Sequence, residues 1–259
     1  MLNLIKTDFK KILSDKLFII AAIISCGISF LIPLLLLGVK KIAENTSTPV
    51  SPDVMTTAMS NSFSIVSTVG IIVVILVTII IGKEFTNGNV RNKVVIGYKR
   101  HQIYISLLIV FYTVLIGLML ISTIIMTLFG LCFFKYSNDA YSSQELVKIF
   151  FLSLLLGLLI QTVVAALCMF FAIGLNNLPL AILVPLLLGL VLNLLSSFLP
   201  DTNEILTWLH YLNICDSLTY LNNYSYTLKE YFARLIPVVI FTPLLLFLGI
   251  KIFNKKDLK

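Results

Sequence analysis

Residues 62–100 read SFSIVSTVGIIVVILVTIIIGKEFTNGNVRNKVVIGYKR. The first half, Ser62–Gly82, is an almost uninterrupted apolar run, and about 20 such residues suffice to cross a bilayer as a helix. The second half, Gly82–Arg100, contains five of the nineteen basic residues of the chain. An apolar run followed at once by a basic segment predicts a membrane-spanning helix whose end faces the cytoplasm.

The composition indicates that the whole chain, and not only this segment, is a membrane protein. Of the 259 residues, 59% are hydrophobic and 12% are charged, and the mean hydropathy is +1.03. A soluble domain has about half apolar residues and about a quarter charged residues. A chain this apolar cannot bury its surface in one globular core, so the bilayer is its expected solvent.

Six apolar runs are long enough to span. They are Leu17–Gly38, Ser62–Gly82, Ile105–Phe134, Ile149–Ile173, Leu180–Leu199 and Leu235–Phe253. The third run is longer than one crossing needs, which predicts that it tilts or protrudes. The sequence therefore predicts an all-α polytopic membrane protein whose residues 1–259 form one transmembrane domain.

The basic residues predict the orientation of these spans. Four lie before the first run, five lie in Gly82–Arg100 and four lie at the C-terminal end, against six in the remaining loops. Because cytoplasmic segments are enriched in Lys and Arg, both termini are predicted to be cytoplasmic. Topology thus explains the net charge of +7, and nucleic-acid binding is not expected.

The first sixteen residues, MLNLIKTDFKKILSDK, predict an amphipathic helix along the inner membrane surface. Its apolar positions follow helical spacing, at Leu2, Ile5, Phe9, Ile12 and Leu13. Its charges Asp8, Lys11 and Asp15 fall to the other side. The alternative is an exposed positive leader that only sets topology.

The outer segment 200–234 is too apolar for a free loop and too interrupted for a span. We expect it to form one or two short helices that lie in, or dip into, the outer interface. Its aromatic residues Trp208, Tyr211 and Tyr220 suit that depth.

Several kinds of chemistry lack their residues in this chain. The spans contain no Asp, Glu, Lys, Arg or His before Lys251, which argues against a proton- or sodium-coupled carrier. The sequence has neither a phosphate-binding loop nor a serine or metallohydrolase motif, and the four cysteines form no paired metal-ligand spacing. No catalytic residue, metal or cofactor is therefore expected in this chain. Gln161 and Asn193 are costly to leave in lipid, which makes a path-lining role for them a hypothesis.

The basic segment itself predicts one short helix between Gly88 and Gly97. Val90, Val94 and Ile96 would form its apolar face, with the basic side chains elsewhere. Such a helix can dock into a groove of a partner protein. A loop that only obeys the charge bias would give the same composition.

The segment Gly82–Leu108 resembles the corresponding segment of type-2 ABC exporter permeases. The matching positions are Glu84, Asn87, Gly88, Arg91, Val94, Val95, Arg100 and Ile103, whereas Asn89 and Gly97–Tyr98 depart from the usual pattern. The N-terminal helix, the six spans and the short helices before the last span are also similar to that family. The resemblance implies that residues 83–104 are a coupling segment whose helix enters a cleft on an ATP-hydrolysing subunit.

On this resemblance the chain is a non-enzymatic permease of the bacterial plasma membrane. It implies two ATPase copies, which bind ATP and Mg, and a second permease chain, identical or related. Hydrophobic or amphipathic cargo, such as antimicrobial peptides, drugs or lipids, is expected to move outward. Glu84 and Arg91 are expected to fix the coupling helix by an ion pair or helix cap, and Val90, Val94 and Val95 to make its buried contact. The alternative is a membrane sensor, immunity or scaffold protein without a transport path.

Overall fold

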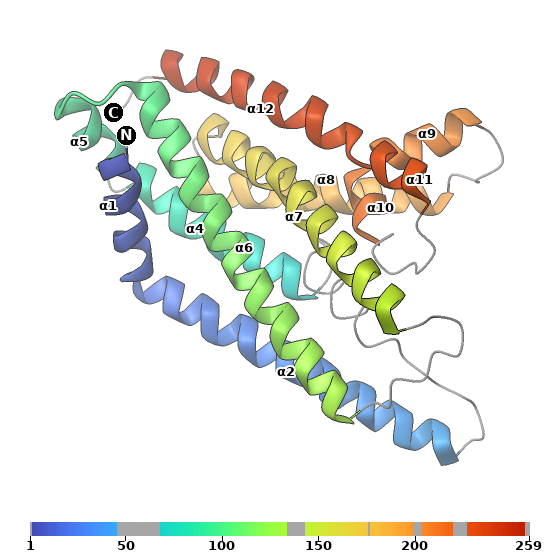
Figure 1. Ribbon diagram of the computed structural model, residues 1–259. Helices are drawn as coiled ribbons and strands as arrows, with labels where there is room; N and C mark the ends of the chain where they lie inside the picture. The colour runs from blue at the N-terminus through green and yellow to red at the C-terminus, as the bar shows by residue number, and fades with distance from the viewer. Residues whose placement is uncertain are drawn as a thin grey trace.

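A computed structural model of the chain describes residues 2–45, 68–86, 88–133, 143–175, 177–198, 204–219 and 227–256. These residues form helices and connecting turns, with no strand among them (Figure 1). The long helices are α2 (Lys16–Asn45), α4 (Thr68–Thr86), α6 (Arg100–Phe133), α7 (Ser143–Gly174), α8 (Leu178–Phe198) and α12 (Ile236–Lys255). The short ones are α1 (Leu2–Leu13), α5 (Asn89–Val95), α9 (Glu204–Leu212), α10 (Ile214–Thr219) and α11 (Leu228–Ala233).

The predicted all-α polytopic membrane fold is confirmed. Among the described residues, five helices are long and apolar enough to cross a membrane, or six when α4 is counted together with α5, which follows it at a bend of 47°. The long third run forms one helix of 34 residues, α6. The second span begins at Thr68 in the described part, and the predicted residues 62–67 lie outside that part.

Helices α6 and α7 form the centre of the bundle. In the most apolar stretch of each helix, 44% of the residues of α6 and 56% of those of α7 are buried inside the protein. The corresponding shares are 22% for α2, 17% for α8 and 11% for the last span. Helix α2 packs against α4 and α6, and α12 packs along α7. The outer faces of α2, α8 and α12 expose large apolar side chains such as Leu35, Val191 and Phe247, which is the surface that a bilayer covers.

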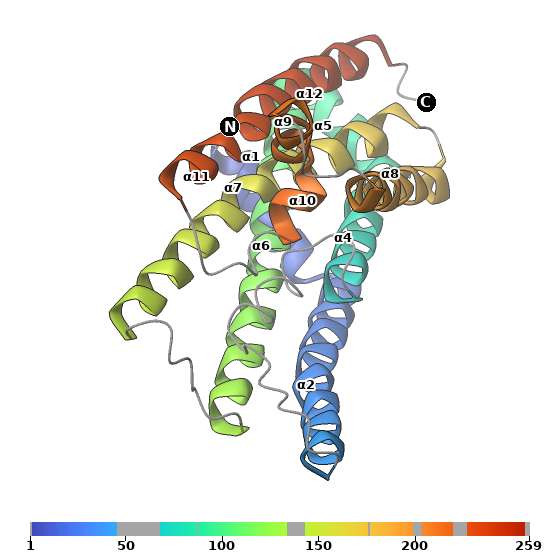
Figure 2. The same cartoon turned by 90° about the vertical axis from the view of Figure 1, so that its right-hand side faces the viewer.

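The three basic segments gather at one end of the bundle. Figure 1 shows the N-terminus, α5 and the C-terminal end of α12 close together, with α9 and α11 toward the other end of α12. Figure 2 shows α2, α4 and α6 side by side, extending away from that region. The charge pattern predicted that these segments share one side, and the structure places them together.

The segment 200–234, predicted to form one or two short helices, contains three in its described part: α9, α10 and α11. Helix α10 is held against α8 by two bonds to main-chain oxygens. Asn213 Nδ2 donates to the oxygen of Leu192 at 2.8 Å, and Cys215 Sγ donates to that of Gly189 at 3.3 Å. His210 and Asp216 form a half-buried pair that joins α9 to α10.

Candidate functional site

Helix α5 is bounded by two glycines, as its sequence predicts. Gly88 precedes it with φ 70° and Gly97 follows it with φ 103°, both in the left-handed region that favours glycine. At the C-terminal end, the Gly97 amide donates to the oxygen of Val94 and the Tyr98 amide donates to that of Lys93. This pair of bonds is the Schellman arrangement, which ends a helix at a glycine. Asn87 lies outside the described residues.

The apolar residues of α5 divide between two faces. Val90 is 1% exposed and belongs to the core of the chain itself, and Val94 is half-buried against that core. Val95 and the following Ile96 are 78% and 75% exposed. The Val90 side chain is thus already enclosed by its own chain, and its contact with a partner stays a prediction. The exposed apolar pair of this segment is Val95 and Ile96.

Glu84, at the end of α4, is buried and neutralised by two lysines. It lies 2.8 Å from Lys11 Nζ and 3.6 Å from Lys93 Nζ, and its Oε1 accepts from Asn89 Nδ2 at 3.3 Å. The expected partner, Arg91, has an exposed side chain instead. The ion pairs of Glu84 thus come from α1 and from the inner side of α5. Arg91 lies two residues before Lys93, about 200° around the helix, and points elsewhere.

Asp8 is the second buried carboxylate of this region. It is 4% exposed, its Oδ1 lies 2.7 Å from Lys93 Nζ, and its Oδ2 accepts from Ser106 Oγ of α6 at 3.0 Å. We call Asp8, Lys11, Glu84 and Lys93 the charge cluster. A buried charge is costly unless an opposite charge compensates it, and the charge cluster pairs two acids with two bases.

The buried stripe of α1 differs from the predicted one. Leu4, Asp8 and Ile12 face inward, whereas Phe9 and Leu13 are exposed. The assignment of Asp8 to the outer, polar side is therefore wrong, because pairing with Lys93 and Ser106 replaces the water that the carboxylate loses. The i, i+4, i+8 spacing of Leu4, Asp8 and Ile12 places them on one helix face. The sequence alone does not indicate that this face is buried, because Asp8 is charged.

Arg100 joins the start of α6 to the end of α12. Its Nη1 donates to the main-chain oxygens of Phe253, Asn254 and Lys256 at 3.3, 3.0 and 2.7 Å. A cation at the C-terminal end of a helix is favoured, because the last carbonyls are unpaired and carry partial negative charge. Lys256 Nζ in turn donates to the oxygen of Ile173 at the end of α7, and burial lowers the pKa of this lysine. Three helix ends are thus held together.

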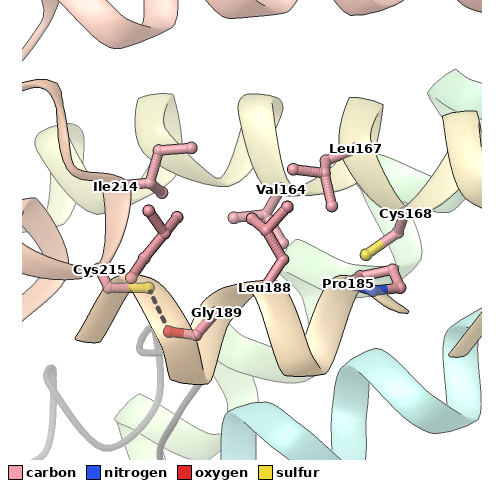
Figure 3. A pocket seen from close by; sticks show the side chains of 9 residues that line it. Val164, Leu167, Cys168, Pro185, Leu188, Gly189, Ile214 and Cys215 are labelled. Carbon is pink, nitrogen blue, oxygen red and sulfur yellow. Dashed lines mark hydrogen bonds between the residues drawn. The ribbon is translucent and has the colours of Figure 1, made fainter. Parts of the chain in front are cut away.

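The two hypothetical path residues lie on different helices. Gln161 is fully buried on α7, and Asn193 is half-buried on α8. Between these helices and α10 lies an apolar cavity, shown in Figure 3, and neither residue lines it. Its lining includes Val164, Leu167, Cys168, Pro185, Leu188, Gly189, Leu192, Ile214 and Cys215. The described residues show an apolar cavity beside α8, and the path-lining role of Gln161 and Asn193 stays a hypothesis.

The cysteines and acidic residues show no metal chemistry in the described part. All four cysteines are free thiols, and no group of three or more His, Cys, Asp or Glu residues there could hold a metal ion. Cys215, outside the spans, is buried, and this burial, with the nearby Asp216 charge, raises its pKa to about 11. A thiol with so high a pKa stays protonated at neutral pH and is a poor nucleophile.

Comparison with known proteins adds a family to this architecture. Residues 4–196, about three quarters of the chain, match the model of the ABC-2 family transporter protein. A comparison with curated protein sequences gives no match. The matched region includes the charge cluster, α5 and five of the long helices. The chain therefore belongs to the ABC-2 family of transporters and is a membrane permease of an ABC transporter.

Proposed function

We propose that this permease is an ATP-driven exporter subunit in which α5 receives the motion of a separate ATPase. The observation that carries the proposal is the exposed pair Val95 and Ile96, at 78% and 75%, at the end of a rigidly capped helix. An exposed apolar patch with polar residues around it marks a surface that another protein or the membrane covers. Arg91 and Lys99 are exposed near the pair, so this segment presents both apolar and basic side chains, as an amphipathic helix that docks into a partner groove does.

The motion has a short route from α5 into the bundle. Helix α5 follows α4 through Gly88 and precedes α6 through Gly97–Lys99, and it packs on both helices. An ATP-bound ATPase dimer that favours one position of α5 would shift the spans toward one arrangement. The energy for transport would then come from nucleotide binding and hydrolysis in the partner, with ATP and Mg bound there.

The family implies a partner ATPase in general, and the rest of the assembly is part of the proposal. Two ATPase copies would bind a pair of permease chains, identical or related. With the α5 end in the cytoplasm of a bacterial cell, both termini face the ATPase side, and cargo moves outward. The apolar cavity beside α8 and the scarcity of charge in the spans favour hydrophobic or amphipathic cargo, such as a peptide, a drug or a lipid-like molecule.

The first test is whether the exposed apolar pair of α5 binds the ATPase. We expect Ile96→Asp to reduce the recovery of an ATPase subunit with the affinity-purified permease by about tenfold or more, because a charge in a desolvated contact is costly. The matched control is Leu209→Asp, which places the same charge at an exposed leucine of α9. Equal recovery with both variants contradicts the docking role of α5.

The identity of the co-purified protein tests the class of function. An ATP-binding subunit in stoichiometric amount supports the transporter. A kinase, or the permease recovered only as an oligomer of itself, supports the sensor or scaffold alternative. In a variant whose four native cysteines are replaced by serine, a cysteine introduced at Ile96 should react with a membrane-impermeant maleimide only after the inner face is exposed, and its labelling in intact cells contradicts the proposed orientation.

A further inference from the structure

Helix α1 is attached to α5 by buried charges. We propose that Lys93 is a positioning residue that makes α1 a second transmitting element, so that a displacement of α5 is delivered to α2 as well as to α4 and α6. This inference rests on the proposed role of α5. It gives Asp8, Lys11 and Lys93 a part in transmitting motion, which the sequence pattern of the segment Glu84–Arg100 does not predict.

The contacts form a closed ring through α1, α5 and α4, and one further hydrogen bond attaches α6 to it. Ser106 of α6 donates to Asp8 of α1, and Asp8 pairs with Lys93 of α5 at 2.7 Å. Lys93 lies 3.6 Å from Glu84 of α4, and Glu84 pairs with Lys11 of α1 at 2.8 Å. Helix α1 thus enters the ring twice, through two side chains one turn apart. Such an arrangement resists both sliding and rotation of α1 relative to α5.

Burial makes the central pair hard to separate. The side chain of Lys93 is 13% exposed and that of Asp8 is 5% exposed, so water cannot replace either partner when they part. Removing one partner of such a pair leaves an uncompensated buried charge. The Lys11–Glu84 pair is weaker by this criterion, because the Lys11 side chain is 49% exposed. Lys93 and Asp8 therefore carry most of the coupling between α1 and α5.

The connection from α1 to α2 is too short to absorb a displacement. The two helices are separated by Ser14 and Asp15 alone. Asp15 holds the turn in place: its Oδ1 accepts from the amide of Leu17 at 3.1 Å, and its main-chain oxygen accepts from that of Phe18 at 3.0 Å. A shift of α1 that follows α5 consequently moves the first turns of α2.

The first measurement tests the attachment in the purified permease in lipid nanodiscs. We expect Lys93→Met and Asp8→Asn to raise amide hydrogen exchange in α1 by about tenfold or more, with α7 and α12 unchanged. Lys93→Arg, which keeps the charge, should exchange like the wild type. So should Lys10→Met, which removes a lysine from the exposed face of α1. Unchanged exchange of α1 in Lys93→Met overturns the attachment.

The second measurement tests transmission in the complex with the co-purifying ATPase. A non-hydrolysable ATP analogue should alter exchange at the start of α2 in the wild type and in Lys93→Arg, and this change should be lost in Lys93→Met. A nucleotide response of α2 that is equal in Lys93→Met overturns the transmitting role of α1. If no ATPase co-purifies, the proposed function and the transmission fail together, while exchange of α1 still decides the attachment.

Discussion

Replacing Arg100 with methionine is expected to release the C-terminal end of α12 and to lower the stability of the permease. The guanidinium of Arg100 donates hydrogen bonds to three main-chain oxygens at the end of that helix, and methionine can donate none. A hydrogen bond to a charged group contributes about 1.5–3 kcal/mol, so we expect a loss of at least that size in the free energy of unfolding. The measurements are the thermal unfolding midpoint in detergent and hydrogen exchange in residues 250–256.

Two further variants separate this contact from a general effect of charge. Lys99→Met removes the neighbouring exposed cation and should leave the midpoint unchanged. Arg100→Lys should fall between the wild type and Arg100→Met, because an ammonium on a shorter stem cannot reach three carbonyls in the same geometry. If Arg100→Met and Lys99→Met unfold at the same temperature, the contact with α12 does not stabilise the fold.

Replacing Gly249 with alanine is expected to separate α12 from α6. A Cβ at this glycine would lie 2.1 Å from the hydroxyl oxygen of Tyr104 and 2.7 Å from its ring carbon Cζ. Tyr104 is fully buried and also contacts the ring of Phe253, so it has little room to retreat. Overpacking of this kind costs about 1–3 kcal/mol, which we expect as a lower unfolding midpoint.

A double-mutant cycle identifies the clash. Tyr104→Phe removes the closest atom, so Gly249→Ala combined with Tyr104→Phe should be more stable than Gly249→Ala alone. The rescue should be partial, because the Cζ atom remains. Tyr104→Phe alone should be neutral or stabilising, since this buried hydroxyl makes no hydrogen bond with the described residues. Additive effects of the two substitutions contradict a direct contact.

The spans and α5 could be predicted from the sequence because their signals are local. Apolar length alone defines a spanning helix. The glycines at positions 88 and 97 mark both ends of α5, and the structure confirms them with left-handed backbone angles. The short helices before the last span were likewise visible as apolar residues too interrupted for a crossing.

The partners within the site could not be predicted in the same way, because they are set by packing between distant segments. Asp8 and Ser106 are 98 residues apart, and Arg100 and Lys256 are 156 apart. A helical projection based on hydrophobicity places Asp8 on the exposed side, because it does not include a lysine on another helix that pairs with it. The burial of Val90 in its own chain could not be predicted for a related reason: the face of α5 that packs on its own chain and the face left for a partner are both apolar.

Arg100 donates hydrogen bonds to main-chain oxygens at the end of α12 and to none of the side chains there. The residue type at position 254 can therefore vary among homologues. Position 100 must stay arginine wherever the last carbonyls of α12 lie at the same distance from the start of α6. An alignment of ABC-2 relatives would then show an invariant cation paired with a variable tail, and covariation methods, which need both partners to change, would miss the contact.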